Sequence, residues 1–148
     1  MNEKIDKFCK ELRTKLDGVD KRLKELNASA KSATEKAKVD AKAQLATLEA
    51  RAKEHHAKVQ TAEATAKAWL EAKKAATSEK IAAWKAQREV HKLAAHADGA
   101  EDYAAASMLL AVAAVEEAEQ AVVEAVVARI DADAAQPSSA KTSPAKSA

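Results

Sequence analysis

The sequence predicts an all-α protein with a long coiled-coil-like helix, a C-terminal antiparallel helical hairpin and a disordered tail. Residues that lose little rotamer freedom in a helix dominate the first 135 positions, and 40 of the 148 residues are Ala. Aromatic residues make up 3% of the chain, which has only two Gly and two Pro, so the composition suits neither strands nor a thick core. Stability must therefore come from helix propensity and from a long, thin apolar seam.

The first segment, residues 1–76, carries apolar residues at steps of three or four, as one face of a helix requires. No Pro precedes position 137, and Gly18 is the only Gly before Gly99, so one continuous helix is expected over residues 2–97. A helix of that length lined mainly by Ala is not stable alone, which predicts a homo-oligomer, a dimer or higher. The predicted interaction seam consists of Ile5, Leu12, Leu16, Val19, Leu23, Leu26, Leu45 and Leu48.

Three places in the sequence carry signals for a helix end. Asp98-Gly99-Ala100-Glu101 combines a C-cap glycine with a capping box, and it predicts a tight turn at 98–100 within a hairpin of residues 77–135. Ser32-Ala33-Thr34-Glu35 and Thr77-Ser78-Glu79 are weaker matches to N-terminal caps. Pro137 then ends the last helix, and the Ser/Ala/Pro/Lys-rich residues 136–148 are expected to be disordered.

The second half of the hairpin is the most apolar part of the chain. Antiparallel pairing about Gly99 places Ile130 near Trp69 and Val115 near Trp84. Glu119 lies within this apolar face, where the same register predicts a buried ion pair with Lys80; the alternative is that Glu119 lies at the edge of a wide stripe. The predicted hairpin core consists of Trp69, Trp84, Met108, Val112, Val115, Val122, Val126 and Ile130.

The formal net charge of +2 conceals an asymmetry along the chain. Residues 1–97 contain 22 basic and 14 acidic side chains, whereas residues 98–135 contain one basic and nine acidic side chains. A basic segment followed by an acidic one can pair with itself, so self-complementarity is favoured over nucleic-acid binding.

Histidine and cysteine do not form a pattern that indicates catalysis or metal binding. His55 and His56 are adjacent and point in different directions on a helix, and His91 and His96 are five residues apart, which does not suit two ligands of one metal. Cys9 is the only cysteine, which excludes an intrachain disulfide and suits a reducing compartment. We therefore expect no enzyme activity, no cofactor and no metal.

The N-terminal residues mix acids and bases and do not resemble a signal peptide. The uncharged stretch at residues 104–115 is too short to span a bilayer, which needs about 20 apolar residues. A cytoplasmic location is therefore expected.

The leading functional hypothesis is a structural or protein-interaction protein that acts through coiled-coil oligomerisation. The alternative comes from residues 30–75, with segments such as Thr61-Ala62-Glu63-Ala64-Thr65-Ala66-Lys67, and from the tail. Their composition resembles phasins, apolipoprotein-like repeats and late-embryogenesis stress proteins, and this resemblance implies coating of a membrane, a lipid surface or a storage-polymer granule. A second alternative is weak nucleic-acid binding by the basic segment, which is disfavoured because acids are interspersed with the bases.

Overall fold

The computed structural model describes residues 2–32 and 34–136, and these residues form four α-helices without a strand. The helices are α1 (Asn2–Lys31), α2 (Glu35–Ala75), α3 (Ser78–Ala86) and α4 (Val90–Ala135). The prediction of an all-α fold is confirmed. The predicted disordered tail lies outside the described residues, apart from Gln136, which follows the end of α4.

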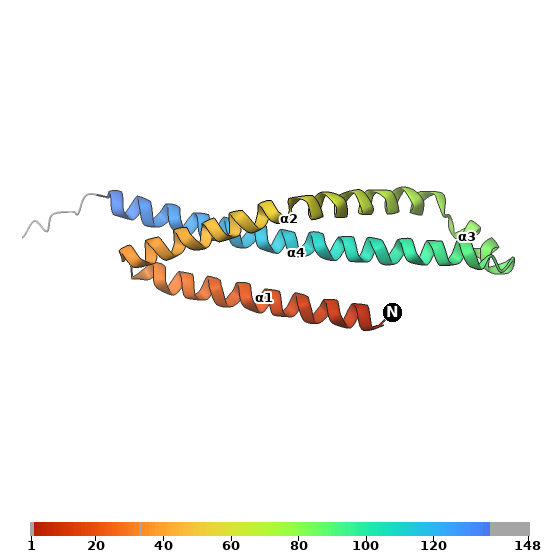
Figure 1. Cartoon of the computed structure of the whole chain (residues 1–148), viewed down its shortest axis with the longest axis horizontal. Coiled ribbons are helices and arrows are strands. Elements are labelled where there is room, and N and C mark those ends of the chain that lie inside the picture. Colours follow the sequence, from red (N-terminus) through yellow and green to blue (C-terminus); the bar gives the residue numbers. More distant parts are fainter. Residues whose placement is uncertain (1, 33, 137–148) are drawn as a thin grey trace, which may run out of the picture.

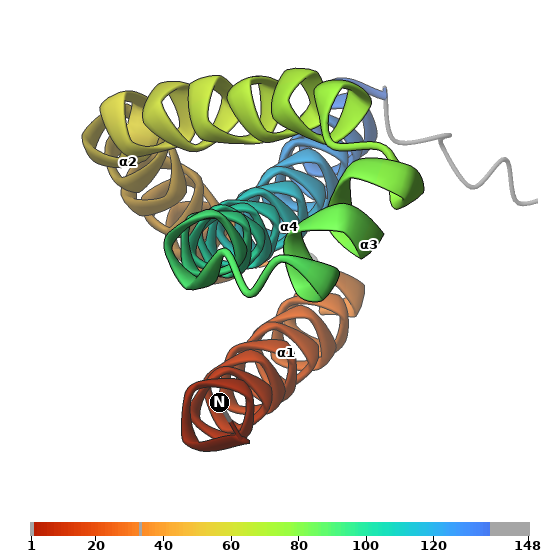
Figure 2. The same cartoon turned by 90° about the vertical axis from the view of Figure 1, so that its right-hand side faces the viewer.

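The three long helices lie side by side in an elongated molecule (Figure 1). The α2 and α4 helices are antiparallel, so Lys38 near the start of α2 pairs with Asp131 near the end of α4. In contrast, α1 runs parallel to α4: Lys4 pairs with Glu101 and Arg22 with Glu119. Figure 2 shows α4 between α1 and the second half of α2, with the short α3 packed at one end of α4.

The chain breaks at both of the weak cap signals, so the predicted continuous helix is wrong. Thr34 has extended backbone angles, and its hydroxyl accepts a 3.1 Å hydrogen bond from the Ala37 backbone N–H at the start of α2. Thr77 does the same for α3, accepting from the Lys80 N–H at 3.3 Å. Residues 2–97 are therefore not one helix, and the Thr34 cap interrupts the predicted segment 1–76. Each Thr satisfies an N–H that the first turn of its helix leaves unpaired.

The predicted turn at 98–100 is also wrong, because α4 passes through Gly99 without interruption. The chain reverses earlier, at Gln87–Glu89, where Arg88 adopts a left-handed φ of 55°. A methyl group at Gly99 would lie only 3.0 Å from two ring carbons of Trp69. Gly99 therefore allows α2 to approach α4 closely, and the local cap signal is overridden by packing.

A thin core forms where α1, α2 and α4 meet. Leu26, Ala41, Leu48 and Val123 form one buried cluster from the three long helices. Five half-buried residues pack against it: Leu23, Leu45, Val126, Val127 and Ile130. A substantial part of the seam that was predicted to pack between chains is therefore buried or half-buried within one chain.

The register of the hairpin differs from the prediction because its turn lies about ten residues earlier. Trp69 packs beside His96 and Tyr103, with ring centroids 5.1 Å and 6.2 Å apart, rather than beside Ile130. Trp84 contacts His96 edge-on at 6.3 Å. The two tryptophans thus form an aromatic cluster at one end of the molecule, while the aliphatic core lies at the other.

Candidate functional site

Glu119 is the only buried charged residue among the described residues, and it joins α1 to α4. Its carboxylate is fully buried and accepts two hydrogen bonds from Arg22, from Nε to Oε1 at 2.6 Å and from Nη2 to Oε2 at 3.0 Å. The Arg22 side chain remains 40% exposed. This two-point geometry matches the planar guanidinium to both carboxylate oxygens, so the buried charge is compensated.

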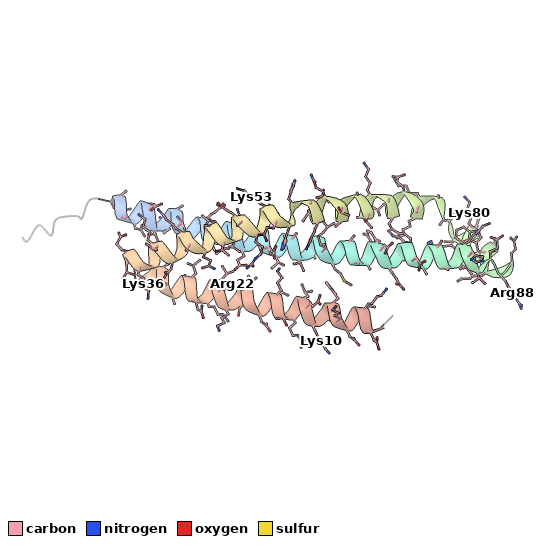
Figure 3. All side chains as sticks on the ribbon, viewed as in Figure 1. Lys10, Arg22, Lys36, Lys53, Lys80 and Arg88 are labelled. Atoms are coloured by element: carbon pink, nitrogen blue, oxygen red, sulfur yellow. The ribbon has the colours of Figure 1, made fainter. Side chains whose placement is uncertain are left out.

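The predicted partner of Glu119, Lys80, is wrong. Figure 3 shows Lys80 in α3 at one end of the molecule, whereas Arg22 lies in the C-terminal half of α1, far from α3. Because α4 begins at Val90 and runs through Gly99, α3 packs near the beginning of α4, more than 20 residues before Glu119. Burial of Glu119 agrees with the helical-wheel argument, but its partner comes from a helix that the prediction placed elsewhere.

A second carboxylate, Glu116, lies one turn earlier on α4 and contacts both other long helices. Lys15 of α1 donates to its Oε1, and Nδ1 of His55 in α2 lies 3.3 Å from its Oε2. Burial by itself raises the pKa of Glu116, but the hydrogen bonds and charges of Lys15 and His55 outweigh it and hold the pKa below its ordinary value. Glu116 is therefore a charged link between three helices.

We call Lys15, Arg22, His55, Glu116 and Glu119 the central charge cluster. Sequence reasoning missed Lys15, Arg22 and His55 as partners, because their positions depend on how α1 and α2 fold back along α4. The charge asymmetry of the chain was the available signal, since basic side chains before residue 98 pair with acidic side chains of α4. Lys4 with Glu101 and Lys38 with Asp131 repeat the same pattern.

An open apolar groove lies beside this cluster, between the N-terminal half of α1 and the α2–α4 pair. Its volume is about 800 Å³. Charged side chains also line it, among them Lys4, Lys7 and Lys58. Its lining includes six large apolar side chains: Ile5, Phe8, Val59, Met108, Leu109 and Val112. The groove marks the stretch where α1 and the α2–α4 pair leave apolar surface incompletely covered.

The predicted seam residues divide into three groups. Val19, Leu26 and Leu48 are buried within the chain. Leu12, Leu23 and Leu45 are half-buried. Ile5 and Leu16 remain 47% and 43% exposed, so α1 keeps apolar surface that this chain does not cover.

The predicted hairpin-core residues are mostly half-buried, and the fully buried position is their neighbour Val123. Val122 is 43% exposed, so the prediction that it belongs to the core is wrong, and Val123 takes that place. Two of the predicted residues, Val126 and Ile130, pack against the core cluster. Met108 and Val112 instead line the groove.

Neither a metal-binding cluster nor a membrane-spanning helix occurs in the part of the chain that the structure describes. No three His, Cys, Asp or Glu side chains within residues 2–32 and 34–136 are grouped as metal ligands would be. None of the four helices has a stretch that is both long and apolar enough to cross a bilayer. Cys9 is exposed as a free thiol.

Comparisons with protein-family models, with curated proteins and with solved structures find no match to this chain. Within the described residues, the features that bear on function are the groove, the central charge cluster and the exposed apolar residues of α1.

Proposed function

We propose that this chain is a non-enzymatic assembly protein that acts through helix–helix association, and that its first partner is a second copy of itself. The observation that carries the proposal is the open groove beside α1, with six large apolar side chains in its lining. Apolar surface in a groove between helices favours association with a further helix, because burial removes that surface from water.

The position of the exposed apolar residues supports this proposal. Ile5 lines the groove and is 47% exposed, and Leu16 on the same helix is 43% exposed. The other large exposed apolar residues are Val39, Leu70, Val90 and Val122, which are distributed over α2 and α4. Isolated exposed residues are ordinary on a protein surface, whereas an exposed residue such as Ile5 within a groove lined by other apolar side chains is typical of an interface.

The charge pattern supports a protein partner of mixed charge. The groove contains Lys4, Lys7 and Lys58 together with Glu11, Glu101 and Glu116, so positive and negative side chains are interspersed. A second copy of this chain offers both signs. A nucleic-acid backbone offers only negative charge, and the carboxylates of the groove would repel it.

Sedimentation equilibrium over a range of protein concentrations tests the proposal. We expect wild-type protein to associate, and Ile5→Lys to weaken association about tenfold or more, because a partly buried Ile contributes roughly 1–2 kcal/mol on full burial. Val39→Lys is the matched control: Val39 is 62% exposed and does not line the groove. Helicity by far-UV circular dichroism should be unchanged in both variants.

Two results would contradict the proposal. One is a monomer at every concentration for wild-type protein. The other is equal weakening by Ile5→Lys and Val39→Lys, which would indicate a general charge effect. Co-sedimentation with anionic vesicles, run in parallel, distinguishes the surface-coating hypothesis, since a coat protein should bind vesicles and gain helicity there.

A further inference from the structure

The apolar stripe of α1 continues into α2 across the break between them. Leu26 near the end of α1, and Ala37 and Ala41 at the start of α2, are all buried. Their spacing fits one helical face if the two helices were joined into one. Residues 32–34 contain neither Gly nor Pro, so their composition permits a helix there. The turn that separates α1 from α2 is therefore one of two conformations compatible with this sequence.

The docking of α1 uses contacts that a second copy can supply equally well. Three ion pairs connect α1 to α4: Lys4 with Glu101, Lys15 with Glu116 and Arg22 with Glu119. All three lie between helices that run parallel. The groove lies along the N-terminal half of α1, the end farthest from the start of α2. At its other end α1 stops at Lys31, only a few residues before α2 begins at Glu35, which keeps this end close to the α2–α4 pair.

We propose that two copies of the chain exchange α1. In the exchanged dimer, α1 and α2 of each copy join into one straight helix, and α1 of each copy docks on α4 of the other. The inference rests on the proposed self-association of the chain. The exchanged dimer rebuilds the groove from α1 of one copy and the α2–α4 pair of the other. Exchange is therefore distinguishable from docking of a second copy into the groove, because Ile5→Lys should weaken docking and leave the dissociation constant of the exchanged dimer unchanged.

The direction of the helices permits this exchange. A two-fold axis across the joined helix makes α2 of the two copies antiparallel, and α4 is antiparallel to α2 within each copy. A straightened α1 therefore runs parallel to α4 of the partner, which is the sense in which α1 and α4 pair within one chain. The three ion pairs can form again between chains without changing direction.

In the closed form, which is the structure described above, α1 packs on α4 of its own chain. The exchanged form differs from it mainly in the segment between α1 and α2. The closed form has two helix ends there and a Thr34 cap, whereas the exchanged form has continuous backbone hydrogen bonds. In the closed form α1 is tethered to its own α4 at an effective concentration in the millimolar range. Exchange should therefore increase with protein concentration and be sensitive to substitutions at the turn.

Two substitutions at the turn should shift the equilibrium in opposite directions. Glu35→Pro places Pro at the first position of α2, after a Thr34 whose ψ of 155° suits a residue before Pro, so the closed form tolerates it. Within a continuous helix the same Pro is unfavourable by roughly 100-fold per chain, so the dimer should be about 10⁴-fold weaker. Thr34→Ala removes the cap of the closed form and should strengthen the dimer ~30-fold.

Ser78→Pro is the matched control. It places Pro at the first position of α3, after Thr77, whose ψ is 159°, and this site lies away from the turn between α1 and α2. Its dimer dissociation constant should equal that of wild type. Equal constants for Glu35→Pro and wild type would overturn the exchange.

Crosslinking then distinguishes exchange from other dimers. In a Cys9→Ser background, chains carrying Lys4→Cys are mixed with chains carrying Glu101→Cys and treated with a short bis-maleimide. The wild-type side chains at these positions are 3.1 Å apart, and exchange places them in different chains, so we expect a covalent heterodimer. The doubly substituted chain should also yield a covalent dimer at concentrations where the protein sediments as a dimer.

The outcomes separate the two proposals. If the protein sediments as a dimer but the doubly substituted chain crosslinks only within itself, the exchange is wrong while self-association stands. If the protein is a monomer throughout, both proposals are wrong.

Discussion

Replacing Arg22 with Ala would leave the Glu119 carboxylate buried without its partner. Breaking a buried ion pair in this way typically costs about 3–5 kcal/mol. Arg22 is 40% exposed while Glu119 is fully buried, so water can reach the vacated space and reduce the penalty. We therefore expect the free energy of unfolding to fall by about 2–3 kcal/mol at pH 7. Urea denaturation followed by circular dichroism at 222 nm measures this loss.

Two further variants separate loss of the ion pair from loss of packing. Arg13→Ala removes an exposed arginine on the same helix and should change stability by less than about 0.5 kcal/mol. The double variant Arg22→Met with Glu119→Met removes both charges and should regain most of the loss, since apolar replacements of similar volume are often neutral. Either of two results would contradict the assigned role of the Arg22–Glu119 ion pair. One is an Arg22→Ala variant as stable as Arg13→Ala, and the other is a double variant less stable than Arg22→Ala.

Three further predictions concern other contacts. Gly99→Ala should lower the free energy of unfolding by about 0–2 kcal/mol, although Ala has a higher helix propensity than Gly, because the new methyl group meets the Trp69 ring at 3.0 Å. A clear gain in stability with unchanged Trp fluorescence would contradict this. The lowered pKa of Glu116 means that its charged form is favoured in the folded state, so its stability contribution is present above its ordinary pKa of 4.5 and is lost as pH falls through the lower folded value. Glu116→Gln should therefore make unfolding less pH-dependent between about pH 5 and pH 3, and an unchanged pH profile would contradict this. Leu48→Ala should lower the free energy of unfolding by about 2–3 kcal/mol in urea denaturation, because Leu48 is 5% exposed in the core. Leu70→Ala, at a site that is 48% exposed, should lower it by well under ~1 kcal/mol. Equal losses would contradict the position of the core.

Local signals in the sequence located two of the three chain breaks. Thr77 caps α3 at the position that its sequence indicates, whereas the cap of α2 is Thr34, two residues after the Ser32 that begins the capping-box pattern. The sequence did not show that these two cap signals prevail while the turn signal at Gly99 does not. A glycine ends a helix when nothing competes with it, but here the Trp69 ring packs where a side chain at residue 99 would be, and α4 continues.

The apolar pattern of the N-terminal segment correctly indicated a buried face, since Val19, Leu26 and Leu48 are all buried. Periodicity describes which face of a helix is apolar, but not which helix covers it. One long helix in an oligomer and two helices folded back on one chain require the same stripe. This ambiguity is the physical basis of the proposed exchange of α1, because both arrangements bury the same residues.

The all-α fold, the thin core and the ability of a basic segment to pair with an acidic one all follow from the amino-acid sequence. These properties depend on composition and on spacings of a few residues, which act locally or over the whole chain without regard to topology. The pairing of Arg22 with Glu119, the sharing of Glu116 by His55 and Lys15, and the groove beside α1 became visible only in the folded arrangement of the helices. Those contacts join residues about 60 to 100 positions apart, and their register depends on where the chain turns, so a shift of about ten residues in one turn replaces every long-range partner.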